Sequence, residues 1–241
     1  MLEITGEGVQ IGLPVVGDLP DEAFLSLMAL VRPPGSKLNK VNNLPIDIAR
    51  NEMVDNLVRD WLFMFDADET IPPEALMRLL SWDLPIVSGI VFLSSIEKPV
   101  PAIYGYEYRR YGRHYYTSKV HEVEEYLYRH KEAHDKPIAT VLPATRDDLI
   151  ECDGVGCGCL LIHRGVFEAI KPPYFVSNNK AYGGEDFYFC RKAKRAGFKI
   201  YADPGVLCGH KPKQLIGHQY FQSWREAGGG EDEYGEIKNR R

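Results

Sequence analysis

The sequence contains no long hydrophobic run, no block of basic residues and few cysteines. No apolar stretch is long enough to span a bilayer, and the N-terminus lacks the pattern of a signal peptide. Lysine and arginine number 29 against 34 aspartates and glutamates, a net charge of −5, without the basic cluster that follows a nucleic-acid backbone. These absences argue against a transmembrane segment and against a nucleic-acid partner.

The five cysteines are an odd number, and they predict reduced thiols rather than a disulfide framework. Three of them lie close together in the sequence, at Cys152, Cys157 and Cys159. A cytoplasmic protein is the simplest interpretation, because disulfides persist mainly in oxidising compartments. The alternative is a structural zinc site with Cys190, Cys208 or His210 as the fourth ligand. The spacings are not the usual Cys-x-x-Cys pair, so zinc is the less favoured interpretation.

A chain of 241 residues, 44% of them hydrophobic, is long enough for one α/β domain. The apolar patterns predict strands at 9–16, 61–65 and 86–93, and helices at 22–31, 46–60 and 72–82. Because strands and helices alternate, we expect a Rossmann-like domain over 1–226, with a mostly parallel central sheet and helices on both faces. Residues 104–136, rich in tyrosine and charge, are predicted to form an insertion, and 227–241 a mobile charged tail.

Residues 61–69 (WLFMFDADE) are the most informative segment. Five large apolar residues indicate a strand that is buried on both faces. Asp66 and Asp68 follow, and an extended backbone would turn both to the same side; Glu69 is a third carboxylate. Ligands bind beyond the carboxyl ends of strands in open α/β sheets, where paired carboxylates suit a divalent cation that holds a phosphate. The alternative is a strand end with solvated or helix-capping acids.

The triplet Asp66-Ala67-Asp68 resembles the DxD motif of nucleotide-sugar glycosyltransferases with the A-type fold, which binds Mn²⁺ or Mg²⁺ under a diphosphate. Residues 47–51 (DIARN) are similar to a segment of related transferases whose arginine approaches the diphosphate. The resemblance implies that Arg50 and Asn51 contact the donor, and an ordinary amphipathic helix is the alternative.

Two further segments resemble the donor site of these enzymes. Pro14 and Val15 end the first predicted strand, where such transferases have a proline-containing turn that touches the nucleoside. Residues 154–164 are similar to a glycine-rich segment that lets the backbone approach the donor sugar, although a plain strand-entry turn competes.

Gly183-Gly184-Glu185-Asp186 leads into a predicted helix and resembles the GGED of inverting β-1,4-galactosyltransferases and the dyad of family-2 enzymes. The resemblance implies that Asp186 is the base that deprotonates the acceptor hydroxyl. Glu185 would orient acceptor or donor hydroxyls, and Gly184 would border the donor. We expect the first helical turn to favour the ionised forms of both acids, and routine helix capping is the alternative.

His210 ends a short apolar stretch 24 residues after Asp186. In the same transferases a histidine near this spacing completes the metal site. The resemblance therefore implies that Asp66, Asp68 and His210 bind the cation, and imidazole beside carboxylates favours Mn²⁺ over Mg²⁺.

Together these segments predict a Mn²⁺-dependent glycosyltransferase of the hexosyltransferase type. It would transfer a sugar from a UDP- or GDP-sugar to a hydroxyl acceptor with inversion, and the insertion at 104–136 would cover the acceptor side. The alternatives are a retaining transferase with the same metal site, a sugar-phosphate nucleotidyltransferase and a non-catalytic sugar- or nucleotide-binding module.

Overall fold

The computed structural model describes residues 8–93, 99–109, 113–130, 139–177, 184–210 and 222. The first part of the chain forms β1 (Val9–Val15), α1 (Asp21–Ala29), β2 (Lys37–Asn42), α2 (Ile46–Asp55), β3 (Trp61–Phe65), β4 (Glu69–Thr70), α3 (Ala75–Ser81) and β5 (Ile86–Ile90). The second part forms β6 (Ile103–Arg109), β7 (Arg113–Ser118), α4 (Val120–Arg129), β8 (Thr140–Val141), a 3-10 helix (Arg146–Asp148), β9 (Ile150–Cys152), β10 (Gly154–Val155), β11 (Cys159–His163), α5 (Arg164–Ile170), α6 (Glu185–Arg195), β12 (Ile200–Leu207) and β13 (Gly209–His210).

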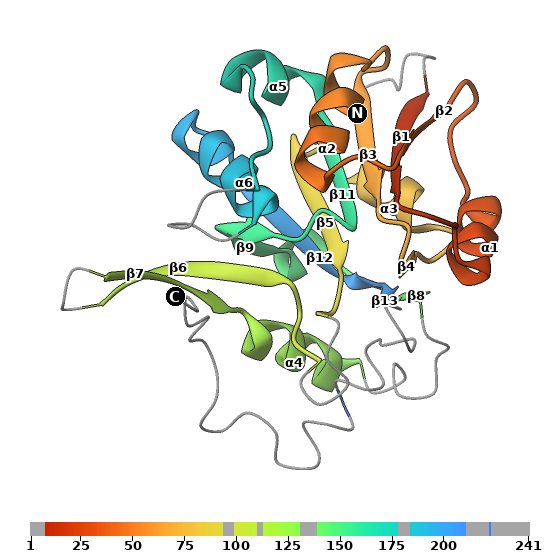
Figure 1. The fold of residues 1–241 in the computed structure, drawn as a ribbon. Coiled ribbons are helices and arrows are strands. Elements are labelled where there is room, and N and C mark those ends of the chain that lie inside the picture. Colours follow the sequence, from red (N-terminus) through yellow and green to blue (C-terminus); the bar gives the residue numbers. More distant parts are fainter. Residues whose placement is uncertain are drawn as a thin grey trace.

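The central sheet has the strand order β2-β1-β3-β11-β5-β12-β8, and β9 also pairs with β12 (Figure 1). Strand β1 is parallel to both β2 and β3, and β5 is parallel to β12. Strand β11 is antiparallel to its neighbours β3 and β5, so those two neighbours run in the same direction. The prediction of a mostly parallel sheet is confirmed.

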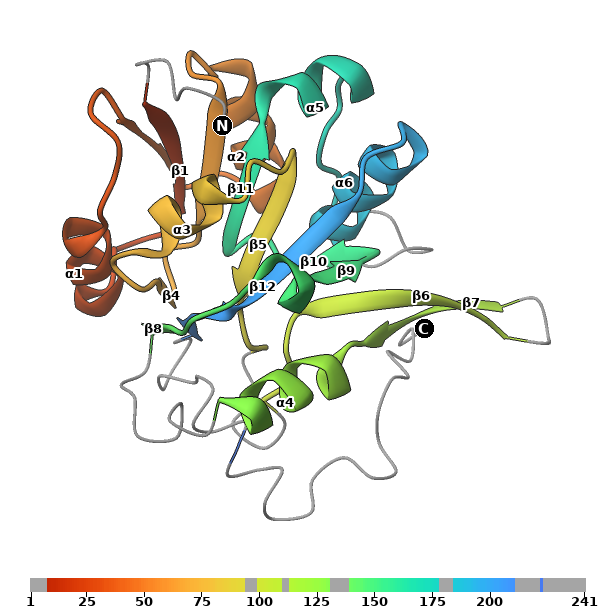
Figure 2. The same ribbon diagram turned by 180° about the vertical axis from the view of Figure 1, so that it is seen from behind.

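Alternate side chains of β3 enter two hydrophobic clusters, one on each face of the sheet. Leu62 and Met64 pack with residues of α2, α4, α5 and α6. Phe63 and Phe65 pack with residues of α1 and α3. Helices therefore cover both faces, as predicted, and the two opposite views show the two sets of helices (Figures 1 and 2). The buried strand at 61–65 is also confirmed.

The connections around β1 create a crevice at the edge of the sheet. Helix α1, between β1 and β2, packs on one face, and α2, between β2 and β3, packs on the other. In the sheet, β1 lies between β2 and β3. The chain leaves β1 to form β2 on one side of it, and then crosses over β1 to form β3 on the other side. The carboxyl ends of β1 and β3 thus flank a topological switch point, the usual ligand site of an open α/β sheet.

Helix α2 ends five residues before the predicted boundary. Beyond it, the Val58 N–H donates to the Gln10 side chain, and Arg164 donates to the carbonyls of Leu57 and Arg59. These contacts hold the backbone on a non-helical path into β3. Helix α3 likewise begins after the proline pair rather than at it, and the Pro73 carbonyl accepts the Val31 N–H.

The described part of the predicted insertion contributes to the core. Strands β6 and β7 form a hairpin that pairs with β10. Helix α4 places Val120, Val123, Tyr126 and Leu127 in the larger hydrophobic cluster. The Tyr126 hydroxyl donates to the Pro143 carbonyl at 2.6 Å. Residues 110–112 and 131–136, and the tail predicted at 227–241, lie outside the described residues.

Candidate functional site

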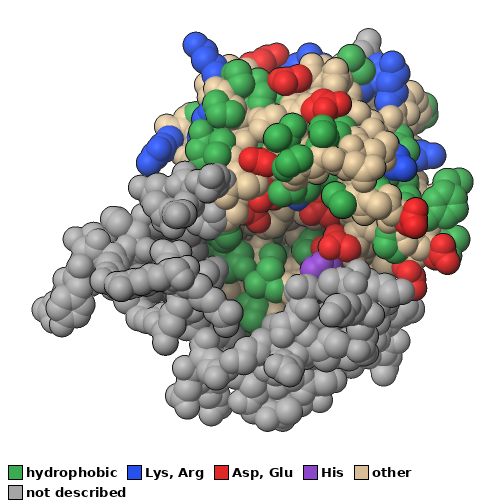
Figure 3. Space-filling view, viewed as in Figure 1, with side chains coloured by type: hydrophobic (Ala, Val, Ile, Leu, Met, Phe, Trp, Pro, Cys, Tyr) green, Lys and Arg blue, Asp and Glu red, His purple; other side chains and the backbone are tan. Residues whose placement is uncertain are grey.

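A cavity of about 380 Å³ lies at the carboxyl ends of β1 and β3. Five of the residues that were selected from the sequence form part of the cavity wall: Pro14, Arg50, Asp66, Asp68 and Glu185. They come from the end of β1, from α2, from the turn after β3 and from the start of α6. The space-filling view shows acidic side chains gathered around a hollow on this face, with a histidine beside one of them (Figure 3). The fold thus joins segments that the sequence places far apart.

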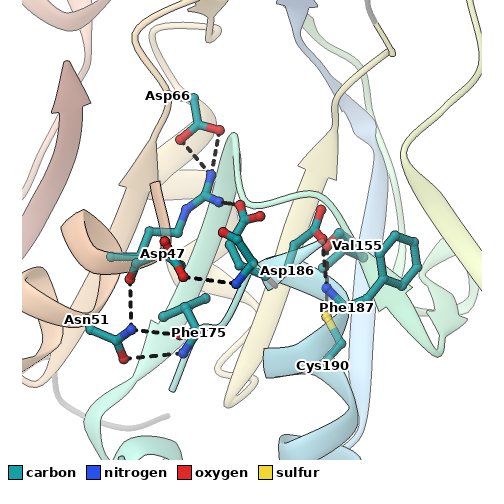
Figure 4. Close-up of polar contacts among 11 residues, drawn as sticks. Asp47, Asn51, Asp66, Val155, Phe175, Asp186, Phe187 and Cys190 are labelled. Carbon is teal, nitrogen blue, oxygen red and sulfur yellow. Dashed lines mark hydrogen bonds and ion pairs between the residues drawn. The ribbon is translucent and has the colours of Figure 1, made fainter. Parts of the chain in front are cut away.

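Arg50 is the buried cation of the cavity wall, with a side chain that is 3% exposed. Its Nη2 donates to both carboxylate oxygens of Asp66, at 2.9 and 2.7 Å, and its Nη1 donates to Glu185 (Figure 4). Burial acts to lower the pKa of Arg50, but the Asp66 carboxylate and other nearby anionic groups outweigh it and raise that pKa. Arg50 therefore stays charged and fastens the start of α6 to the end of β3.

Asp186 lies in the first turn of α6, where its Oδ1 accepts the Phe187 N–H at 2.7 Å (Figure 4). A Cβ on Gly184 would lie 2.8 Å from that oxygen, so a larger residue here would require the Asp186 carboxylate to shift. Burial raises the pKa of Asp186, against the opposing effects of Arg50 and of the Phe187 N–H. The prediction that the ionised form is favoured is therefore wrong for Asp186, because desolvation is the larger effect. A raised pKa makes this carboxylate a stronger base.

Three potential metal ligands meet where β4 pairs with β13. In this antiparallel pairing His210 is opposite Glu69, and Gly209 is opposite Thr70. Asp68, Glu69 and His210 each offer one ligand atom, and these atoms all lie within 4.8 Å of one another. Asp68 is also part of the cavity wall, so the cavity and this group share one side chain.

Both ring nitrogens of His210 lie within hydrogen-bond distance of an oxygen. Its Nδ1 lies 2.9 Å from the Phe92 carbonyl oxygen, which can only accept, so Nδ1 carries the proton. Its Nε2 lies 3.1 Å from Asp68 Oδ2. In a neutral imidazole that nitrogen has a lone pair, which would repel the carboxylate unless a second proton or a cation lies between them. Metal-binding histidines have the same arrangement, with the other ring N–H on a carbonyl.

Glu69 was noted in the sequence as a third carboxylate but was not selected as a ligand. It is 2% exposed, and within the described part of the chain its Oε2 has no hydrogen-bond partner. Burial, followed by the charges of Asp68 and Asp66, raises the pKa of Glu69 well above its ordinary value. A Cβ on Gly158 would lie 3.0 Å from Glu69 Cγ and Oε1, so this glycine makes room for the carboxylate. The signal in the sequence was its position directly after the DxD triplet.

Asp66 and Asp68 do not face the same partner. The expectation that they would rested on an extended backbone, but the chain turns, and the Glu69 N–H donates to the Asp66 carbonyl at 3.1 Å. The Asp66 carboxylate lies on Arg50, whereas Asp68 faces His210. The assumed backbone geometry was therefore wrong, although both side chains line the cavity.

Two residues predicted to bind the donor lie elsewhere. Val15 is 1% exposed and packs in the hydrophobic core. The Asn51 amide donates to the carbonyls of Asp47 and Phe175, and its oxygen accepts the N–H groups of Tyr174 and Phe175 (Figure 4). Asn51 thus anchors the 174–175 segment to α2, and its polar atoms are already engaged. Gly184 borders Asp186, as described above, and Gly183 lies outside the described residues.

All five cysteines are buried free thiols. Within the ranges that the structure describes, the potential metal-ligating group contains no cysteine. The zinc alternative is therefore not supported by the geometry.

No protein-family model and no curated protein matches this sequence. The structure is similar to that of A197 from STIV, with a TM-score of 0.53 and 16% identity over 86% of this chain and 92% of that chain. At this identity the likeness shows a shared fold alone. None of the helices in the described residues is both long enough and apolar enough to cross a bilayer.

Proposed function

We propose that this protein is a metal-dependent glycosyltransferase that moves a sugar from a nucleoside-diphosphate sugar to a hydroxyl acceptor. The position of Asp68 carries the proposal, because this side chain belongs both to the cavity wall and to the group of potential metal ligands. A cation held there would face whatever occupies the cavity. The cavity lies at the switch point of the sheet, where α/β domains bind nucleotides.

The donor atoms of Asp68 and His210 fit a divalent cation. Nδ1 of His210 is committed to the Phe92 carbonyl, which leaves Nε2 as the ligand atom beside Asp68 Oδ2. Carboxylate oxygen with imidazole nitrogen favours Mn²⁺ over Mg²⁺. When bound, such a cation supplies positive charge that stabilises the departing diphosphate.

Asp186, which follows the cavity residue Glu185 in the sequence, and two residues of the cavity wall assist transfer in distinct ways. Asp186 accepts the proton of the acceptor hydroxyl, since its Oδ1 is held by the Phe187 N–H and the second oxygen remains for the substrate. Glu185 lines the cavity in a position fixed by Arg50 and orients a hydroxyl. Pro14 borders the end where a nucleoside would lie. One base and one attacking hydroxyl give a single displacement, which inverts the anomeric centre.

A screen of UDP- and GDP-sugars tests the proposal. The wild-type protein should release nucleoside diphosphate from one donor when Mn²⁺ is present and lose this activity in EDTA. An Asp68→Asn variant should be inactive, and the exposed Asp55→Asn is the matched control. Release of pyrophosphate would instead indicate a nucleotidyltransferase, and a retained anomeric configuration in the product would indicate a retaining transferase. Donor binding without turnover for any acceptor tried would favour a binding module.

The free thiols are typical of a protein from a reducing compartment, so we place the enzyme in the cytoplasm.

A further inference from the structure

We propose that Glu69, rather than Asp66, completes the cation site with Asp68 and His210, and that Asp66 is a positioning residue that acts through Arg50. This inference rests on the proposed function for the presence of a divalent cation. The assignment of ligands can nevertheless be tested with Mn²⁺ alone.

The surroundings of Glu69 suit a metal ligand. Glu69 is 2% exposed, yet its Oε2 has no hydrogen-bond partner among the residues that the structure describes. A buried carboxylate without a partner is strongly unfavourable, and coordination of a cation satisfies it. The other two ligand atoms lie within 4.8 Å, so a single ion can reach all three groups.

The backbone holds Glu69 in this position from two sides. The pairing of β4 with β13 sets Glu69 directly opposite His210. Gly158, at the entry to β11, approaches Glu69 so closely that a Cβ would lie 3.0 Å from its Cγ and Oε1. The glycine-rich segment therefore makes room for a carboxylate of the site, a role that differs from the predicted contact with the donor sugar.

Asp66 is engaged by a different cation. Both of its carboxylate oxygens accept hydrogen bonds from Arg50, which is 3% exposed. If Asp66 moved to a metal ion, the buried guanidinium would keep only Glu185 as a carboxylate partner. This assignment also leaves the cation site electrically neutral. The carboxylates of Asp68 and Glu69 carry two negative charges, which offset the two positive charges of Mn²⁺, and the imidazole of His210 is neutral.

Titration of Mn²⁺ into the full chain, followed by the electron paramagnetic resonance signal of the free ion, tests this assignment. Glu69→Gln and Asp66→Asn are matched variants, since each replaces a carboxyl group by an amide and keeps the shape of the side chain. We expect Glu69→Gln to weaken Mn²⁺ binding by at least about tenfold and Asp66→Asn to change it by less than about threefold. Circular dichroism confirms that each variant is folded.

The opposite ranking of the two variants, or equal effects, would overturn the assignment. If Glu69→Gln does not fold, crystals of the wild-type protein soaked in Mn²⁺ decide the question. The anomalous peak should lie within about 2.5 Å of a Glu69 oxygen, and a peak bound by Asp66 instead would reject the proposal. Mn²⁺ binding through Glu69 without nucleoside diphosphate release from any donor would reject the proposed function and leave the ligand assignment intact.

Discussion

Replacement of Arg50 by methionine should destabilise the protein strongly, because the guanidinium is the cation between two carboxylates. Arg50 is 3% exposed, while the side chains of Asp66 and Glu185 are 22% and 14% exposed. Loss of one member of a fully buried ion pair costs about 3–5 kcal/mol. Since both carboxylates keep some contact with water, we expect the free energy of unfolding to fall by about 2–4 kcal/mol. For a chain of this length, that is a decrease in Tm of about 4–16 °C.

Equilibrium unfolding in urea, followed by circular dichroism and tryptophan fluorescence, measures this change. Arg195→Met is the control, because Arg195 is an exposed residue at the last turn of α6 and its loss should cost less than about 0.5 kcal/mol. Arg50→Lys keeps the charge but lacks the planar fork that reaches both carboxylates, so its stability should be intermediate. A stability of Arg50→Met within about 0.5 kcal/mol of the wild type would refute the central role of this ion pair.

Asp186→Asn should reduce the rate of transfer by roughly 10²–10⁴ and leave Mn²⁺ affinity unchanged, and near-normal transfer would exclude Asp186 as the base. Since burial raises the pKa of Asp186, the wild-type rate should fall with decreasing pH at a pKa above the ordinary aspartate value, and this acidic limb should be absent from the residual rate of the Asn variant. Replacement of Asp203, which is fully buried and paired with Arg78 at 2.9 Å, by alanine should lower the free energy of unfolding by about 2–4 kcal/mol, because Arg78 keeps some contact with water. The control Asp55→Ala should be nearly neutral in the same urea titration. The backbone N–H of Thr145 lowers the pKa of Asp148 from its ordinary value to about 2, so its stabilising contribution is present above about pH 4 and is lost as the pH falls towards 2. The difference in stability between the wild type and Asp148→Asn should therefore shrink over that range, and a constant difference would contradict this explanation.

The strands and helices near the site could be predicted because their patterns are local. The five apolar residues of β3 divide between the two faces of the sheet as a doubly buried strand requires. The glycine before α6 and the two acids in its first turn also mark that helix start correctly. Helix α2 was predicted too long, because contacts of Val58 and Arg164 with distant segments end it early.

The partners within the site could not be predicted from spacing. Arg50 and Glu185 are 135 residues apart, and no pattern in the sequence paired them. Asp68 and His210 are 142 residues apart, and only the resemblance to the transferases grouped them. The assumption of an extended backbone after β3 gave the wrong direction for Asp66, since a turn of the backbone places it on Arg50. Glu69 was overlooked for a related reason, because only the pairing of β4 with β13 brings it opposite His210.

Asp68 is proposed to join a cation site to a nucleotide-binding cavity, and calorimetric titration of nucleoside diphosphate tests this most directly. UDP and GDP are each titrated into the wild-type protein with Mn²⁺ and then in EDTA. We predict that one nucleotide binds at least about tenfold more tightly when Mn²⁺ is present, because its diphosphate and Asp68 share the cation. Equal affinity with and without Mn²⁺, or no binding of either nucleotide, would contradict the account.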